Sequence, residues 1–160
     1  GFAKPRTPVF QTVRVEALLD SVVELAVHAI GRQPITIRHG ADPGLPQLEC
    51  DVEQIKQVLL NLVINAIQAM PKGGEVALSA RLQGGDVVIG VSDRGCGVNP
   101  ENLGKLFDPF FTTKETGTGL GLPVALQIVA QHGGSLWADP NPDLGMTFSF
   151  RLPLRRQDAP

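Results

Sequence analysis

The stretch VLLNLVINAIQAM, residues 58–70, decides how this chain folds, because ten of its thirteen side chains are apolar. The three exceptions, Asn61, Asn65 and Gln68, fall at i, i+4 and i+7, the spacing that lines side chains up along one face of a helix. A helix that is apolar almost all round is a core helix, and an unpaired amide buried there costs about 1–3 kcal/mol. We therefore expect a polar ligand or a metal to face this stripe of amides.

The core helix has clear start and stop signals. Asp51 can cap its first turn, and Gln54, three residues later, completes the pattern of a capping box. The segment Pro71-Lys-Gly-Gly74 ends it. The sequence therefore predicts one long helix between these two signals.

Hydrophobic periodicity predicts the other elements. They are helices over 15–31, near 101–106 and over 119–132, and strands at 34–38, around Leu48, and at 75–82, 86–92, 135–139 and 146–153. Gly84-Gly85 joins two of these strands and is typical of a hairpin. Because hairpins rather than regular strand–helix–strand units separate the helices, we expect an α+β fold, a two-layer sandwich with a mostly antiparallel sheet.

Composition excludes several classes of protein. The 160 residues, 42% hydrophobic and 19% charged, suit one soluble globular domain. The net charge of −2, with no basic run beyond Arg155-Arg156, argues against a nucleic-acid partner. Cys50 and Cys96 lie apart without a CxxC pattern, which favours a reducing compartment over a disulfide framework. No apolar run reaches about 18 residues, so we expect no membrane contact by this chain.

The two ends of the chain differ from the middle. The opening GFAKPRTPVF is broken by prolines and is typical of a linker cut from a longer protein. We therefore expect residues 1–14 to be a linker, residues 15–154 to be one domain, and residues 155–160 to be a tail.

Asp93 and the glycines after it suggest a binding turn. Asp93 ends a predicted strand and is followed by Gly95 and Gly97. Its carboxylate can accept a hydrogen bond from an exocyclic amine, while the glycines let the backbone approach a flat ring closely. An Asp-Gly turn without a ligand is the alternative interpretation, because such turns are common.

A second glycine-rich segment, GTGLGL at 117–122, opens the last predicted helix. The unpaired N–H groups and the positive end of a helix favour a phosphate there. No strand directly precedes it, as a Rossmann motif requires, and the Gly-Lys-Ser/Thr of a Walker motif is absent. The segment is therefore a phosphate loop of another type or a glycine-rich hinge.

Between the two glycine segments lies LFDPFFTTKE, residues 106–115. Its phenylalanines, Phe107, Phe110 and Phe111, either anchor a loop on the core or form a docking patch for a partner domain. Lys114 is placed where a loop could bring an ammonium group to a phosphate, although a solvated lysine is the commoner case.

Together these segments resemble the catalytic and ATP-binding domain of sensor histidine kinases, within the superfamily shared with gyrase, Hsp90 and MutL. Four motifs occur in order: an N box at 61–66, a first glycine box at 93–97, an F box at 107–111 and a second glycine box at 117–122. The form TTK-x₂-GTGLGL is most similar to kinases of the nitrogen-regulator type. The resemblance, which covers about residues 15–154, implies the Bergerat fold. In that fold a mixed, mostly antiparallel sheet of about five strands packs on three helices, with ATP under a lid at about 98–118.

The resemblance also implies roles by position. Asn65 would bind Mg²⁺ and bridge to the ATP phosphates, and Asn61, one turn earlier, would approach the phosphates or metal-bound water. Asp93 would accept the adenine amino group, and Gly97 would let the ring pack closely. The implied ATP contacts further include Gly95, Thr113, Lys114, Gly117, Thr118, Gly119, Leu120, Gly121 and Thr147.

Asn61 discriminates within the superfamily, and two other positions depart from the pattern of many relatives. Members that hydrolyse ATP carry a glutamate in place of Asn61 as general base; an amide cannot take that proton, which implies transfer rather than hydrolysis. Gln68 stands where many relatives have a lysine, which leaves more of that role to Lys114. Met146 stands where relatives often have Ser or Thr near the adenine, so the polar contact is expected from Thr147 or water.

The implied function is transfer of the ATP γ-phosphate to a histidine on a helical dimerisation domain outside this chain. Phe107, Phe110 and Phe111 would contact that domain, a response regulator would act downstream, and the location would be cytoplasmic. Two alternatives stay open: a serine kinase of the anti-sigma type, and a regulatory module that holds nucleotide without transfer. The chain's own histidines lack the acidic neighbour of a phosphoacceptor; we interpret His28 and His132 as helix-end residues and His39 as a loop residue.

Overall fold

A computed structural model describes residues 6–108 and 121–156 of the chain. Its elements, in chain order, are β1 (Gln11–Val13), α1 (Val15–Ile30), β2 (Ile35–Ala41), β3 (Leu48–Cys50), α2 (Val52–Gln68), β4 (Gly74–Gln83), β5 (Asp86–Ser92), the 3₁₀ helix η1 (Pro100–Lys105), α3 (Gly121–Gln131), β6 (Ser135–Pro140) and β7 (Met146–Pro153).

Five strands form the main sheet in the order β2-β4-β5-β7-β6. Only β2 and β4 pair in parallel; the other neighbours are antiparallel, and β4 and β5 form the predicted hairpin. A separate two-stranded sheet joins β1 to β3. The expected α+β class, with a mixed and mostly antiparallel sheet of five strands, is therefore confirmed.

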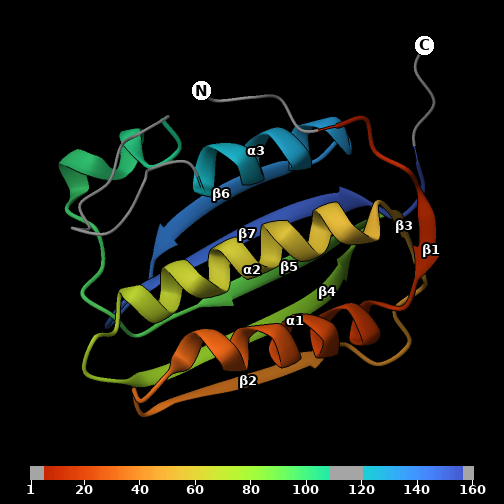
Figure 1. Cartoon of the computed structure of the whole chain (residues 1–160). Helices are drawn as coiled ribbons and strands as arrows, with labels where there is room; N and C mark the ends of the chain where they lie inside the picture. The colour runs from red at the N-terminus through yellow and green to blue at the C-terminus, as the bar shows by residue number, and fades with distance from the viewer. Residues whose placement is uncertain (1–5, 109–120, 157–160) are drawn as a thin grey trace.

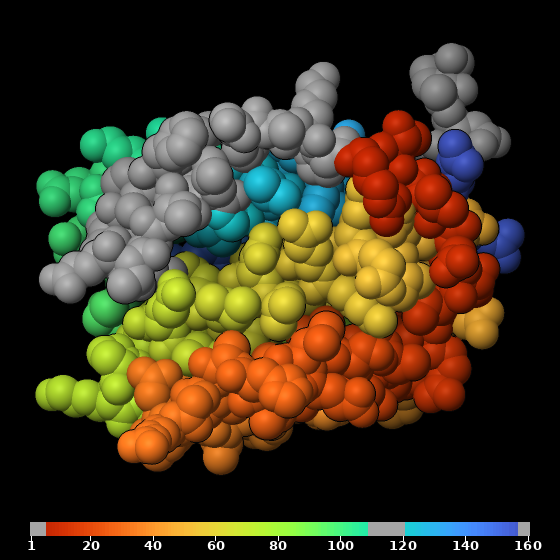
Figure 2. Space-filling view, in the orientation of Figure 1, coloured from red at the N-terminus to blue at the C-terminus, as the bar shows by residue number. Residues whose placement is uncertain are grey.

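The three α-helices cover one face of this sheet, with α2 between α1 and α3 (Figure 1). In the space-filling view α1 and α2 lie side by side on this face, and part of α3 is visible beside α2 (Figure 2). The core lies between the two layers, and strand side chains enter it at alternate positions. On β5 and β7 these side chains are Val87, Ile89, Val91, Phe148, Phe150 and Leu152.

Two elements differ from the sequence prediction. Residues 11–13, which we assigned to a linker, form β1 and pair with β3 from Gln11↔Cys50 to Val13↔Leu48. Three residues are too few to show a period, so only the partner strand reveals them. His39, interpreted as a loop residue, lies in β2, because pairing with β4 continues as far as Ala41↔Ala80. None of the described helices is both long and apolar enough to cross a membrane.

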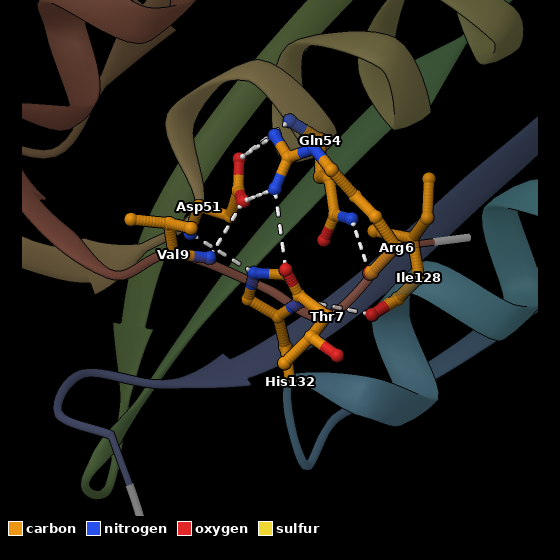
Figure 3. Close-up of polar contacts among 7 residues, drawn as sticks. All are labelled: Arg6, Thr7, Val9, Asp51, Gln54, Ile128 and His132. Carbon is orange, nitrogen blue, oxygen red and sulfur yellow. Dashed lines mark hydrogen bonds and ion pairs between the residues drawn. The ribbon is translucent and has the colours of Figure 1, made fainter.

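Residues 6–10, which we call the N-terminal strap, hold the first turn of α2 (Figure 3). The Arg6 guanidinium pairs with the buried carboxylate of Asp51, and the Val9 N–H donates to the same carboxylate at 2.8 Å. Asp51 Oδ1 also accepts from Gln54 N at 3.0 Å, which confirms the predicted cap. The other half of the capping box is wrong, because the Gln54 amide donates to the Arg6 carbonyl at 2.8 Å instead.

His132 takes the remaining place in this cap. Its Nε2 accepts the Asp51 N–H at 3.0 Å, and its Nδ1 lies 2.8 Å from the Ile128 carbonyl (Figure 3). A nitrogen that accepts a hydrogen bond carries no proton, so the ring is neutral and its Nδ1–H donates to Ile128. His132 thus joins the end of α3 to the start of α2.

Burial and partners set the titration of this cluster. Burial raises the pKa of Asp51, but the Arg6 guanidinium and the N–H groups of Val9 and Gln54 outweigh it and hold that pKa at about 2. Burial lowers the pKa of His132, against the opposing pull of the Ile128 carbonyl and the Asp51 charge. Burial, with the adjacent Asp51 charge, raises the pKa of Cys50 to about 12. The strap end of the molecule is therefore a buried polar cluster in which every group is paired except the Gln54 Oε1, which has no hydrogen-bond partner among the described residues.

Candidate functional site

The motif residues that the structure describes gather at the end of the sheet and helices opposite the strap (Figure 1). The last turns of α2, the end of β5, the start of α3 and the turn between β6 and β7 all lie there. At the standard rise, the 14 residues from Asp51 to Asn65 separate this end from the strap by about 21 Å. Sequence segments far apart thus meet in one region.

The predicted amide stripe runs along α2 but is less buried than we expected. Asn61 and Asn65 are half-buried and Gln68 is exposed. The expectation that these amides are buried in the core is therefore wrong, because this face of α2 is only partly covered. Asn61 Nδ2 donates to the Gly121 carbonyl at 3.2 Å, so the stripe faces the first turn of α3.

Asp93 is only 2% exposed and follows directly after β5. Its Oδ1 accepts from Gly95 N at 2.8 Å and from Met146 N at 3.3 Å. Two main-chain N–H groups thus fix the orientation of the Asp93 carboxylate, which lies on the side of the sheet that the helices cover. A carboxylate held in one orientation beside a glycine turn suits recognition of an amine.

The two glycines after Asp93 have different reasons to be glycine. A Cβ on Gly95 would lie 2.4 Å from the Ala69 carbonyl oxygen, so the turn packs directly on the end of α2. Gly97 has a φ of +74°, and a Cβ there would meet nothing within 4 Å, so its backbone borders open space. The surface beside Gly97 is therefore the part of this turn that a flat ring can approach.

Of the three glycines predicted to form the phosphate loop, the structure describes only the last, Gly121. Gly121 begins α3, and a Cβ there would lie 3.9 Å from Asn61 Cγ. The other predicted contacts of this loop lie outside the described residues; they are Thr113, Lys114, Gly117, Thr118, Gly119 and Leu120.

Thr147 lies on the other face of the sheet from the Asp93 carboxylate. Thr147 is paired with Ser92, and its hydroxyl donates to Asn141 Oδ1 at 2.6 Å and lies 3.0 Å from Ser92 Oγ. Side chains alternate along a strand, so Met146 points toward the helix layer and Thr147 away from it. This placement does not support the idea that Thr147 replaces the missing polar contact near a base.

Phe107 packs inward. Its ring meets Phe148 of β7 edge-on, with 6.4 Å between centroids, and it is half-buried against the core. This contact favours the anchor interpretation for Phe107. Phe110 and Phe111 lie outside the described residues.

The sequence reasoning missed one polar group beside this site. Asn141, in the turn between β6 and β7, donates to the Asp93 carbonyl at 2.8 Å. Asn141 belongs to no motif, and 48 residues separate it from Asp93 in the chain, so no local pattern could reveal the contact.

Asn65 fits a magnesium ion by its chemistry. Mg²⁺ prefers oxygen ligands and usually takes one or two from the protein, with the rest from water and phosphate. An amide oxygen supplies one such ligand. Within residues 6–108 and 121–156, no group of three or more His, Cys, Asp or Glu side chains is arranged to hold a metal ion.

A two-layer α/β sandwich with a buried Asp-Gly turn beside an amide-bearing helix defines a class of nucleotide-binding domains. The family model described as "Histidine kinase-, DNA gyrase B-, and HSP90-like ATPase" matches residues 50–156. The chain belongs to this family.

Several of the similar relatives and solved structures are named as histidine kinases. Sensor histidine kinase ZraS of Escherichia coli is 38% identical over 94% of this chain, which spans 32% of that protein. The catalytic domain of histidine kinase ThkA has a TM-score of 0.83 at 34% identity, covering 91% of this chain and 96% of that domain. Full-length ShkA in complex with AMPPNP has a TM-score of 0.85 at 30% identity, with 98% of this chain and 33% of ShkA covered. ThkA has also been solved in complex with the response regulator protein TrrA. The chain thus spans between 21% and 36% of the length of the similar curated relatives.

Proposed function

We propose that this chain is the ATP-binding catalytic domain of a sensor histidine kinase and that it presents the γ-phosphate of Mg-ATP to a histidine on a separate helical domain. The observation that carries the proposal is the Asp93 turn, in which main-chain N–H groups orient a buried carboxylate next to the open backbone at Gly97. Membership of the ATPase family and the likeness to ShkA, solved with AMPPNP, support it.

In this proposal, Asp93 accepts a hydrogen bond from the 6-amino group of adenine, and the ring lies against Gly97. The Asn65 oxygen holds Mg²⁺, which neutralises phosphate charge when bound. Asn61, already joined to the start of α3 at Gly121, borders the phosphates. Gly95 supports the turn, and the remaining expected contacts are Thr113, Lys114, Gly117, Thr118, Gly119 and Leu120.

The amide at position 61 favours transfer over hydrolysis. Activation of water needs a group that can take its proton, and an amide cannot do so. The domain would then act by positioning ATP and neutralising charge, with the acceptor side chain supplied from outside. We expect slow ATP hydrolysis by the chain alone.

Binding is tested by titrating the chain with a non-hydrolysable ATP analogue in the presence and absence of Mg²⁺, followed by calorimetry. We expect saturable binding that Mg²⁺ strengthens. Folded protein that gives no heat with either form of nucleotide would refute the proposal.

Transfer is tested with γ-labelled ATP and a histidine-bearing helical hairpin supplied in trans. Label that is lost in acid identifies phosphohistidine, whereas acid-stable label identifies the serine kinase of the anti-sigma type. Tight ATP binding without any transfer would favour the regulatory module.

We further propose a cytoplasmic location and two partners: the histidine-bearing dimerisation domain and a response regulator. The ThkA–TrrA complex supports a response regulator as partner. Since Phe107 is partly packed on Phe148, we expect Phe110 and Phe111 to supply more of the contact with the dimerisation domain.

A further inference from the structure

The turn between β6 and β7, residues 141–145, packs against the back of the Asp93 strand end. Asn141 Nδ2 donates to the Asp93 carbonyl at 2.8 Å and to the Leu144 carbonyl at 3.0 Å. The Asn141 N–H closes the turn by donating to the Gly145 carbonyl at 2.9 Å. One amide side chain therefore ties the turn to the residue that follows β5.

The Asn141 amide has two further contacts. Nδ2 lies 3.3 Å from Ser92 Oγ, and Oδ1 accepts the Thr147 hydroxyl at 2.6 Å. A hydroxyl has one proton, and Thr147 gives it to Oδ1, so in the 3.0 Å contact between Ser92 and Thr147 the Ser92 hydroxyl donates. The Nδ2 group has two protons for three acceptors, so its longer contact with Ser92 is shared with the shorter bonds to the Asp93 and Leu144 carbonyls. Asn141, Ser92 and Thr147 thus form one connected cluster of hydrogen bonds.

Both main-chain polar groups of Asp93, its N–H and its carbonyl, are hydrogen-bonded to residues 141–146. Its N–H donates to the Met146 carbonyl at 2.9 Å, and its carbonyl accepts from Asn141. Gly145 has a φ of +87°, and a Cβ there would lie 2.1 Å from the Asp93 carbonyl oxygen. The turn therefore approaches as closely as a glycine allows, and Asn141 fills the hydrogen-bonding position beside it.

We propose that Asn141 is a positioning residue for Asp93, a role that rests on the proposed function of Asp93 in binding the adenine amino group. Asn141 fixes the main chain of Asp93 from the face of the sheet opposite the helices. The Asp93 carboxylate, on the other face, then meets the base in one orientation. Asn141 thereby sets selectivity for a base that carries a 6-amino group, without touching the nucleotide.

The residue type at 141 matters because its neighbours are carbonyls. Aspartate has the same shape but no N–H, so Asn141→Asp would turn a carboxylate oxygen toward the carbonyls of Asp93 and Leu144. Asn141→Ala removes the donor without adding repulsion. The matched control is Asp143→Asn in the same turn, which breaks the exposed ion pair between Asp143 and Arg94, 3.3 Å apart.

The experiment compares two ligands, ATP and purine riboside triphosphate, which lacks the 6-amino group. We expect Asn141→Asp to weaken ATP binding about three- to tenfold while the binding of purine riboside triphosphate stays within twofold, with a smaller loss of the same kind in Asn141→Ala. Asp143→Asn should leave the ratio of the two dissociation constants unchanged. In an Asp93→Asn background, Asn141→Asp should add less than twofold, because the group it positions is gone.

Equal weakening for both ligands in Asn141→Asp and Asn141→Ala would overturn the positioning role, since a merely structural residue would affect both. An unchanged ratio in both variants would overturn it as well. A wild-type chain that binds ATP and purine riboside triphosphate equally, or neither of them, would instead overturn the adenine role of Asp93 or nucleotide binding itself. If Asn141→Asp fails to fold, Asn141→Ala alone decides the question.

Discussion

The two most deeply buried aspartates of the described chain, Asp51 and Asp93, lie at opposite ends of the helix layer and are each 2% exposed. Asp51, the N-cap of α2, is held by the Arg6 guanidinium and by the main-chain N–H groups of Val9 and Gln54. Main-chain N–H groups of two turns hold the Oδ1 of Asp93, beside the open backbone at Gly97. Burial of a carboxylate therefore does not by itself mark a functional site; the kind of partner and the space beside it do.

Each of these aspartates has a cysteine nearby, and the largest expected difference between the two ends lies there. Cys50 is buried and its pKa is raised to about 12, whereas Cys96 is exposed. The Cys50 thiol is both protonated at pH 8 and out of reach of the reagent, so its alkylation should be slower than that of the exposed Cys96 by about two orders of magnitude or more. Mass spectrometry after timed iodoacetamide treatment measures both rates in one sample.

Unfolding in denaturant should equalise the two thiols and serves as the control. Comparable labelling of Cys50 and Cys96 in the native protein would mean that the strap end is open. Cys96 lies between the two glycines of the Asp93 turn. Slower labelling of Cys96 in the presence of Mg-ATP would therefore indicate that the nucleotide binds beside this turn.

Substitution of Asp51 should act on stability. Asp51→Ala removes a helix cap, worth about 0.5–2 kcal/mol, and leaves buried donors unpaired at about 1–3 kcal/mol, so we expect a loss of about 2–4 kcal/mol in the free energy of unfolding. Denaturant titration measures this loss. The dissociation constant for ATP of the folded variant should change less than about twofold. A large loss of affinity with little loss of stability would reverse the roles we assign to the two aspartates.

Substitution of Asp93 should act on binding. Asp93→Asn keeps an oxygen for the Gly95 N–H but removes a charge-assisted hydrogen bond of about 1.5–3 kcal/mol, which is roughly ten- to a hundredfold in affinity. Titration of a fluorescent ATP analogue measures the effect. The adenine role would not survive an unchanged dissociation constant.

The smallest effect is the pH dependence of stability, which should arise at the strap end. The unfolded histidine titrates near 6.5, and burial lowers the pKa of folded His132, so the unfolded state binds more protons as the pH falls through 6.5 and the free energy of unfolding decreases. Asp51 contributes stability above pH 3.8 that is lost as the pH falls toward about 2. Denaturant unfolding at a series of pH values from 7.5 to 5 isolates the histidine.

A non-titrating acceptor tests the assignment to His132. His132→Asn should flatten the stability profile between pH 7 and 5, whereas His28→Asn, on the exposed face of α1, should leave it as it is in the wild type. A profile that His132→Asn does not alter would place the titrating group elsewhere.

Much of the fold could be predicted because its signals are local. Asp51 and Pro71 bracket α2, and Gly84-Gly85 marks the hairpin between β4 and β5; the structure has both. The strap, β1 and His132 could not be predicted, because they depend on contacts between distant residues. The pair Asp51–His132 is 81 residues apart in the chain, and Val9–Asp51 is 42 apart.

The candidate site divides in the same way. Asn61 and Asp93 could be singled out because they belong to motifs whose residue types have a chemical reason. The closeness of Asn61 to Gly121 and the hydrogen-bonded cluster of Asn141, Ser92 and Thr147 depend on how the strands and helices are assembled. The expected role of Thr147 shows the limit of motif reasoning, since one step along a strand moves a side chain to the other face.

The strap end also holds the other end of the described chain. The Arg156 guanidinium lies over the Phe10 ring at 5.0 Å, and the Arg156 N–H donates to the Glu49 carboxylate. Anything joined to either end is thus attached at the same side of the domain. If the domain rotates about its strap end, the candidate site at the opposite end moves farthest. The two ends are about 21 Å apart along α2, so a rotation of about 30° would move the candidate site by about 11 Å.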